Sequence, residues 1–246
     1  MKKLVYYLFF ISVSAFSFTA CDKDDDAGAV SSDAVAEEVA ASLGYASSGL
    51  SSEIVDVASL SGTYEEEALK STAADTIYKA DSTFVRSNLP GATVTYSYAC
   101  TMEYGFVWSS GGLLNMYYNG SLTGGYNGVR SSMDDARTSE WIASGIETSS
   151  SSYILNGSSS RTGSYQSKVR NQSAMNSTSQ IGLHNVKVSK SSLQITEGTL
   201  DWTISGMVNG TAYTYDVSVT YSANGTATLA IGKEVYTVDL SSGEVL

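Results

Sequence analysis

The stretch VTYSYACTMEYGFVWSSGGLLNMYYNGSLTGGY, residues 94–126, contains the most regular pattern in the chain. From Val94 to Trp108 every second residue is apolar or aromatic, whereas the residues between them are mostly Thr, Ser, Ala, Glu or Gly. Alternation with a period of two is typical of a β-strand with one buried face, most often in an antiparallel sheet. The first arm is longer than most strands, so we expect a bend or bulge in it, at Gly105.

The two arms of this stretch predict a hairpin with a defined register. The even-numbered residues are apolar in both 94–108 and 114–126. Antiparallel partners lie on the same face, so the two residue numbers of each pair must add to an even number. A five-residue loop over 109–113 gives a sum of 222. The predicted pairs are Trp108 with Leu114, Phe106 with Met116, Tyr104 with Tyr118, Met102 with Gly120, Cys100 with Leu122 and Tyr98 with Gly124. Met102 and Tyr98 would then cover the two glycines.

Shorter segments with the same alternation follow and predict a mainly β fold. We expect these strands at 138–146, 152–161, 175–188, 193–207, 211–221, 227–231 and 235–240. Asn209-Gly210 and Asn224-Gly225 are strong hairpin signals, because both residue types tolerate positive φ. About nine strands with short connections predict an antiparallel β-meander over residues 92–246, either a curved sheet or a partly open barrel.

The preceding segment, residues 32–85, is acidic and rich in Ala and Ser, and it predicts short helices. Asp33 is placed to cap a first helix that ends at Gly44. A second amphipathic run extends from Leu50 to Gly62, and residues 65–79 are compatible with a third helix or a loop. Such short helices are unstable alone, so we expect their apolar faces to pack on the sheet. The apolar positions of the first helix are Val35, Val39 and Leu43.

The N-terminus has the features of a secretory signal. Lys2 and Lys3 precede an uncharged, largely apolar run over residues 4–20, and small residues precede Cys21. An uncleaved transmembrane helix is the alternative, although the run is at the short end of a membrane span. The motif ending at Cys21 resembles a bacterial lipobox, in which the cysteine is acylated and becomes the first residue. The resemblance implies a signal peptide over 1–20, lipidation of Cys21, including palmitate, and a membrane anchor.

The acidic tract after this cysteine resembles the export signal of surface lipoproteins of the Bacteroidota. It consists of Asp22, Lys23, Asp24, Asp25 and Asp26, in a tether that we place at residues 21–31. The resemblance implies a lipid-anchored protein of the outer membrane, displayed at the cell surface. Residues 153–157, 161–164, 168–171 and 224–229 also resemble a group of uncharacterised β-rich Bacteroidota lipoproteins, and this second resemblance implies no particular chemistry.

Composition excludes several kinds of site. Residues 21–246 contain 12 basic and 25 acidic residues, which argues against nucleic acid as a partner. The two cysteines, Cys21 and Cys100, cannot form a disulfide framework or a zinc finger, and no cofactor is expected. Cys100 is predicted to be a buried, inert thiol on the aromatic face. His184 is the only histidine, and without a nucleophile-elbow motif it is interpreted as an ordinary strand residue.

A few residues are candidates for ligand contacts. Tyr117 lies on the otherwise polar face of its predicted strand. Arg161, Lys168 and Arg170, together with Tyr165, form a basic cluster in a predicted Ser-rich loop that could hold an anionic group. The candidate acids for hydrolysis are Glu103, Asp134, Asp135, Glu140, Asp201 and Asp216. Thr76 and Ser82 lie in short motifs that resemble a Bacteroidota O-glycosylation signal.

These observations leave three classes of function open. The first is a non-enzymatic binding or structural envelope protein whose partner is a glycan or another envelope protein. The second is a carrier or scaffold that holds an acyl chain or a partner subunit in a half-open sheet. The third is a secreted, carboxylate-dependent glycan hydrolase, although no catalytic constellation is visible in the sequence.

Overall fold

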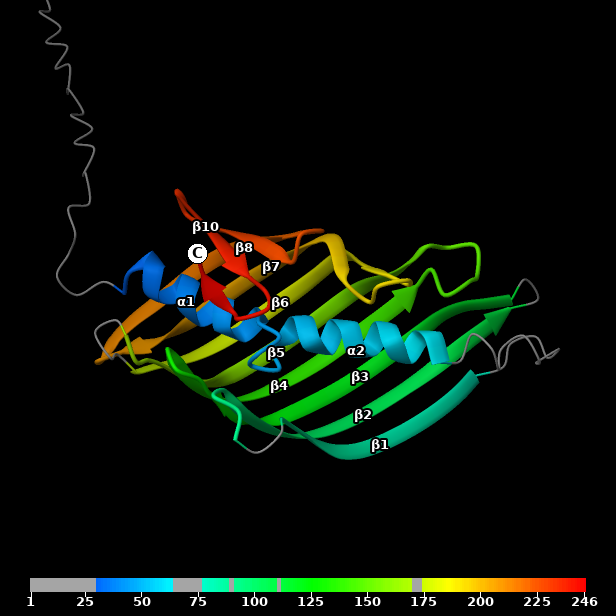
Figure 1. The fold of residues 1–246 in the computed structure, drawn as a ribbon, viewed down its shortest axis with the longest axis horizontal. Coiled ribbons are helices and arrows are strands. Elements are labelled where there is room, and N and C mark those ends of the chain that lie inside the picture. Colours follow the sequence, from blue (N-terminus) through cyan, green and yellow to red (C-terminus); the bar gives the residue numbers. More distant parts are fainter. Residues whose placement is uncertain (1–29, 64–76, 89–90, 110–111, 170–173) are drawn as a thin grey trace, which may run out of the picture.

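The computed structural model describes residues 30–63, 77–88, 91–109, 112–169 and 174–246. Eleven strands form one antiparallel sheet, in which each strand pairs with its neighbours in the sequence. The sheet is curved and does not close into a barrel, so the predicted meander is confirmed in its curved-sheet form (Figure 1). The strands are β1 (Ile77–Ser87), β2 (Thr95–Ser109), β3 (Gly112–Asn127), β4 (Ser131–Ser144), β5 (Ser152–Ser167), β6 (Ala174–Ser189), β7 (Ile195–Val208), β8 (Thr211–Ser222), β9 (Thr226–Ile231), β10 (Glu234–Asp239) and β11 (Glu244–Val245).

The predicted register of the first hairpin is confirmed over most of its length. Every β2 residue from Thr95 to Val107 pairs with the β3 residue that gives a sum of 222. The register shifts after Val107, so Trp108 pairs with Leu113 and the predicted Trp108–Leu114 pair is wrong. The register irregularity therefore lies between Val107 and Trp108, at the end of the hairpin, and not at Gly105, where the bend was predicted.

The glycines of β3 are not covered as predicted. A Cβ atom on Gly120 would lie 2.2 Å from the hydroxyl oxygen of Tyr118, so Tyr118 rather than Met102 fills the space above this glycine. A Cβ atom on Gly124 would lie 2.0 Å from the carbonyl oxygen of Ser97, so the neighbouring main chain leaves no room there. The main chain therefore requires glycine at position 124, whereas at position 120 a larger residue would have to displace the Tyr118 side chain.

All nine predicted strands are present, and two more were missed. β1 lies in the segment predicted to be helical, and the expected domain boundary near residue 85 therefore cuts through the sheet. β1 is an edge strand that pairs only with β2, and its residues 81–87 are exposed or half-buried, so burial imposes little alternation on its sequence. β11 is a two-residue strand beyond the last predicted hairpin. β4 and β5 are also longer than expected, because they include residues 131–137 and 162–167.

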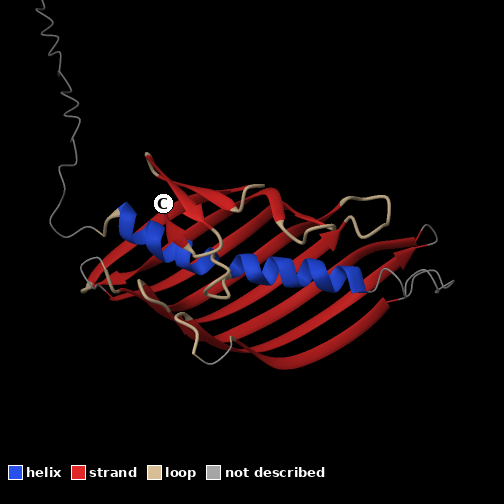
Figure 2. Ribbon diagram, in the orientation of Figure 1, coloured by secondary structure: helices blue, strands red, loops and turns tan. Residues whose placement is uncertain are grey.

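In the described part of the chain two helices precede the sheet, α1 (Ser32–Leu43) and α2 (Leu50–Thr63). Ser31, not Asp33, caps α1, because its side chain accepts a hydrogen bond from the backbone N–H of Ala34 at 3.3 Å. Gly44 ends this helix as predicted. Both helices lie across the same, concave face of the sheet (Figures 1 and 2), which confirms the expected packing. Neither α1 nor α2, the helices of the described part, has the length and apolarity that a bilayer span requires.

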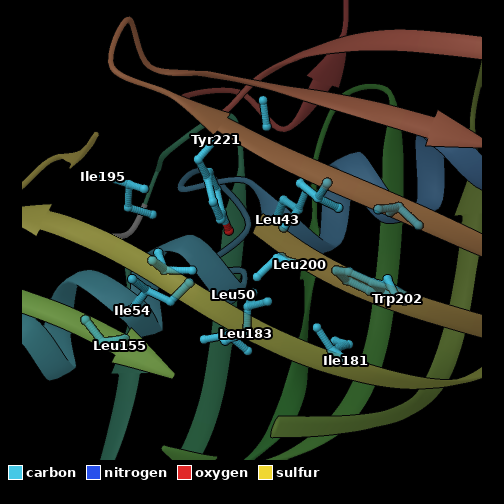
Figure 3. Close-up of a cluster of buried hydrophobic side chains, with 14 of the residues drawn as sticks. Leu43, Leu50, Ile54, Leu155, Ile181, Leu183, Ile195, Leu200, Trp202 and Tyr221 are labelled. Atoms are coloured by element: carbon cyan, nitrogen blue, oxygen red, sulfur yellow. The ribbon is translucent and has the colours of Figure 1, made fainter. Parts of the chain in front are cut away.

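The core lies between the helices and the concave face (Figure 3). Leu43, Leu50 and Ile54 of the helices are fully buried against side chains from the sheet. Burying one such side chain stabilises the fold by about 1.5–3 kcal/mol. The sheet residues labelled in Figure 3 are Leu155, Ile181, Leu183, Ile195, Leu200, Trp202 and Tyr221. Four aromatic residues of β2 on this face are at most 9% exposed, Tyr98, Tyr104, Phe106 and Trp108, and Tyr96 is half-buried.

Candidate ligand-binding face

The face of the sheet that points away from α1 and α2 is called the outer face below. In β4 the alternation is nearly perfect: Asp134, Ala136, Thr138 and Glu140 are exposed, and the residues between them are buried. The same alternation in β6 exposes Asn176, Thr178 and Gln180. The outer face is thus a broad surface of mostly polar side chains that project from the sheet.

Hydroxyl side chains form a row across five neighbouring strands of the outer face. The register makes successive partners of Thr83, Thr101, Ser121, Thr138 and Ser160. The Oγ atoms of Thr101 and Ser121 lie 2.6 Å apart, and those of Thr138 and Ser160 lie 2.8 Å apart. These two cross-strand hydrogen bonds restrict the orientations of four of the five hydroxyl groups, so most of the row is organised before any ligand arrives.

A shallow hollow of about 910 Å³ lies beside this row. Gly125 faces outward, opposite Ser97 on β2 and Asp134 on β4, and a Cβ atom on it would lie 2.3 Å from Oδ1 of Asp134, so the Asp134 side chain lies over this glycine. The hollow is lined by Thr95, Tyr96, Ser97, Thr123, Gly124, Gly125, Tyr126, Asn127, Ser132, Asp134, Asp135, Ala136 and Thr162. Its exposed groups are therefore hydroxyl, amide and carboxylate.

A second hollow, of about 360 Å³, lies on β1, β2 and β3. It is lined by Asp81, Ser82, Thr83, Thr101, Met102, Glu103, Asn119, Gly120 and Ser121. No lysine or arginine is among the described residues that line either hollow. Both hollows thus offer many hydrogen-bonding groups and negative charge.

The candidate acids are divided between the two faces. Asp135 is buried on the concave face, whereas the other acids project outward: Glu103, Asp134, Glu140, Asp201 and Asp216. Glu103 and Glu140 flank Asn119 from the neighbouring strands. A glycosidase acid normally needs a buried setting that raises its pKa, and Glu140 is exposed. This arrangement suits hydrogen bonding to a ligand better than proton transfer.

The predicted basic loop is wrong, because β5 continues through it and carries Arg161 into the core. The Arg161 side chain is 0% exposed, and its Nη1 lies 2.9 Å from Oε1 of Glu38 on α1. Its Nε lies 3.1 Å from Oδ2 of Asp135. Ser177 also accepts a hydrogen bond from Nη1, at 3.1 Å. Arg161 therefore fixes the first helix to the sheet and does not reach a ligand at the surface.

The other members of this predicted cluster lie elsewhere. Tyr165 is buried on the concave face at 4% exposure. Lys168 is exposed and donates a hydrogen bond to the carbonyl oxygen of Gly128 at 2.6 Å. Arg170 lies outside the described residues. The structure thus separates Arg161 and Tyr165 from Lys168.

A second buried ion pair fixes α2 in the same way. Arg137 is paired directly with Arg161 across β4 and β5, and its Nε donates to Oε2 of Glu53 at 2.8 Å. The hydroxyl of Tyr118 donates to the other oxygen of Glu53 at 3.2 Å. Burial and the adjacent Glu53 carboxylate raise the pKa of Tyr118. Each helix thus inserts one carboxylate among polar groups of the concave face.

Tyr117 supports the outer face of the sheet at Gly105. These two residues are direct partners, and a Cβ atom on Gly105 would lie 2.3 Å from the ring of Tyr117. The ring therefore lies over the glycine, and the bulge expected at Gly105 is absent because this position is in register. Tyr117 is half-buried, next to the exposed Ile142 of β4. It is less accessible than its position on a polar face suggested.

Cys100 is buried at 3% exposure, as predicted, and burial raises the pKa of its thiol. His184 lies in β6, also as predicted, with its Nε2 3.0 Å from Oδ2 of Asp201 on the outer face. Ser82 is half-buried in β1, opposite Met102. The remaining candidates lie outside the described residues: Thr76, Cys21, Asp22, Lys23, Asp24, Asp25 and Asp26.

The hydroxyl row and the two hollows were not predicted from the sequence. One signal for them was present, because the odd-numbered positions of 95–101 are Thr, Ser, Ala and Thr. Small polar residues repeated on one face of a strand indicate an outward surface, but the row appears only when five strands are aligned. Comparison of the chain with protein-family models, curated proteins and solved structures found no match.

Proposed function

We propose that this chain is a non-enzymatic, lipid-anchored protein of the outer membrane, displayed at the cell surface, and that its outer face binds a neutral glycan. The observation that carries the binding proposal is the composition of the two hollows. They present hydroxyl, amide and carboxylate groups on a sheet whose other face is occupied by helices.

The charge of the hollows favours a neutral ligand that carries many hydroxyl groups. Asp134 in one hollow, and Asp81 and Glu103 in the other, would repel an anionic ligand. Carboxylates accept strong hydrogen bonds from sugar hydroxyls. The aligned Thr and Ser hydroxyls can both donate and accept, as a glycan surface requires.

Replacement of Asp134 with alanine is expected to weaken glycan binding about tenfold or more. A hydrogen bond to a charged group contributes about 1.5–3 kcal/mol, and 1.4 kcal/mol corresponds to a factor of ten. The purified protein is first tested for binding to a panel of neutral and uronate-containing polysaccharides. Calorimetry then measures the affinity of the original protein and of the variant for those that bind. Asp216→Ala, on the same face but outside both hollows, is the matched control. The proposed glycan-binding site is wrong if no neutral glycan binds, or if Asp134→Ala and Asp216→Ala lose affinity equally.

The lipid anchor and the display rest on the resemblances of the N-terminal sequence. Replacement of Asp24, Asp25 and Asp26 with alanine is expected to leave acylation intact but to make the protein resistant to protease added to whole cells. Removal of the acidic charge would prevent recognition by the export system and retain the protein inside the outer membrane. Equal protease sensitivity of the two forms would mean that the tract serves only as a solvated tether.

The two alternative functions make different demands on the structure. A carrier of an acyl chain would need the aromatic concave face, where Phe106 is 0% exposed beneath the helices, so α1 and α2 would have to move away. A hydrolase would use Glu103 and Glu140, which lie on either side of Asn119. If the bound glycan is cleaved, and Glu140→Gln stops cleavage but not binding, the hydrolase replaces the binding protein as the better proposal.

A further inference from the structure

The two hollows of the outer face are adjacent along the same two strands. The first ends on β3 at Thr123, and the second begins at Ser121, the next outward position of that strand. On β2 the first hollow includes Thr95 and Ser97, and the second includes Thr101 and Glu103. From the first to the last of these β2 residues the strand extends for about 26 Å, at ~3.3 Å per residue.

The surface that joins the hollows is built from small side chains. On the outer face the register pairs Ser97 with Gly125, Ala99 with Thr123, and Thr101 with Ser121. None of these six side chains is larger than threonine, so no bulky group separates the hollows. Ala99 and Thr123, the pair at the junction, are both exposed.

We propose that the two hollows form one trough, which binds an extended, unbranched neutral glycan lying along β2 and β3. This inference rests on the glycan-binding function proposed above and adds the shape and direction of the ligand. Polar groups lie at both ends of the trough, Asp134 and Asn127 at one and Glu103 and Asn119 at the other. The small residues between them leave room for successive sugar rings. A compact or branched ligand would use one hollow only.

The length of the ligand tests this proposal. Linear cello-, xylo- and manno-oligosaccharides, from disaccharides to chains longer than the trough, are titrated into the purified full-length protein. For the series that binds, affinity is expected to rise at least about tenfold with chain length and then to level off, because added hydrogen bonds contribute about 0.5–1.5 kcal/mol each. Affinity that is independent of length would overturn the trough but leave the glycan-binding function standing. If no series binds, and neutral polysaccharides fail as well, the proposed function fails.

Thr123→Trp places a bulky side chain at the junction of the hollows. This variant is expected to lose the gain in affinity that long chains have over disaccharides. Thr178→Trp is the matched control, because Thr178 is an exposed threonine of the same outer face on β6, outside both hollows. Ala99→Trp tests the junction again from β2, and circular dichroism establishes that each variant is folded. Equal effects of Thr123→Trp and Thr178→Trp on long chains would overturn the proposal.

Discussion

Replacement of Arg161 with methionine should lower the free energy of unfolding by about 3–5 kcal/mol, the usual cost of removing one partner from a buried ion pair. The loss leaves the carboxylates of Glu38 and Asp135 in the core without their cation. Glu38 is 0% exposed, and the hydroxyl of Tyr213 donates to its Oε2 at 3.2 Å. Urea unfolding followed by circular dichroism measures the change.

Arg130→Met is the matched control for this experiment. Arg130 pairs with Glu244 at 3.5 Å, but both side chains are about half exposed, at 50% and 45%. Exposed ion pairs contribute only about 0–1 kcal/mol, so this variant should remain close to the original stability. A loss at Arg161 no larger than that at Arg130 would contradict the role assigned to the buried group. A triple variant, Arg161→Met with Glu38→Met and Asp135→Asn, should recover much of the stability, because no charge is then left unpaired.

Arg161 also illustrates what sequence patterns cannot reveal. It lies in a run rich in Ser and Gly that favours a loop, and its partner Glu38 is 123 positions earlier in the chain. No residue near Arg161 in the sequence indicates that the Glu38 carboxylate of α1 will lie beside it. The same holds for Arg137 and Glu53, whose pairing depends on how α2 crosses the sheet.

The first hairpin was predictable because one strong local pattern fixes it. Alternation over β2 and β3 leaves only even sums for the register, and the observed sum of 222 holds up to Val107. The prediction failed at Trp108, where the choice of turn decides the pairing. The sequence analysis missed β1 for the opposite reason: in this edge strand, which pairs on one side only, the alternation of apolar and polar residues is weaker.

The candidate binding face was predictable only in part. The outward positions of β2 were already visible as small, polar residues. Their combination with Ser121 and Asp134 into hollows requires the register of three strands. A surface made by many strands is a property of their alignment, which no single segment encodes.

The second prediction with a large expected effect concerns the membrane anchor. Replacement of Cys21 with alanine should abolish labelling of the protein by radioactive palmitate and release it from the membrane fraction. Each acyl methylene buried in lipid contributes about 0.8 kcal/mol, and stable anchoring requires more than one chain or a second signal. Loss of the acylated cysteine removes all of that binding energy at once. Labelled cultures are fractionated, and the protein is followed by immunoblot and autoradiography.

Cys100→Ala is the control that separates acylation at the N-terminus from modification of any thiol. Cys100 is the only other cysteine, and it is buried at 3% exposure in a small cluster with Tyr98 and Leu122. Its replacement should leave both palmitate labelling and membrane association unchanged. If the Cys21→Ala protein still carries label, Cys21 is not the acylated residue. If it loses the label but still sediments with membranes, residues 4–20 act as a retained membrane helix instead of a cleaved signal. Surface display through the acidic tract would then lose its basis, whereas the glycan-binding trough, built on β2 and β3, would be unaffected.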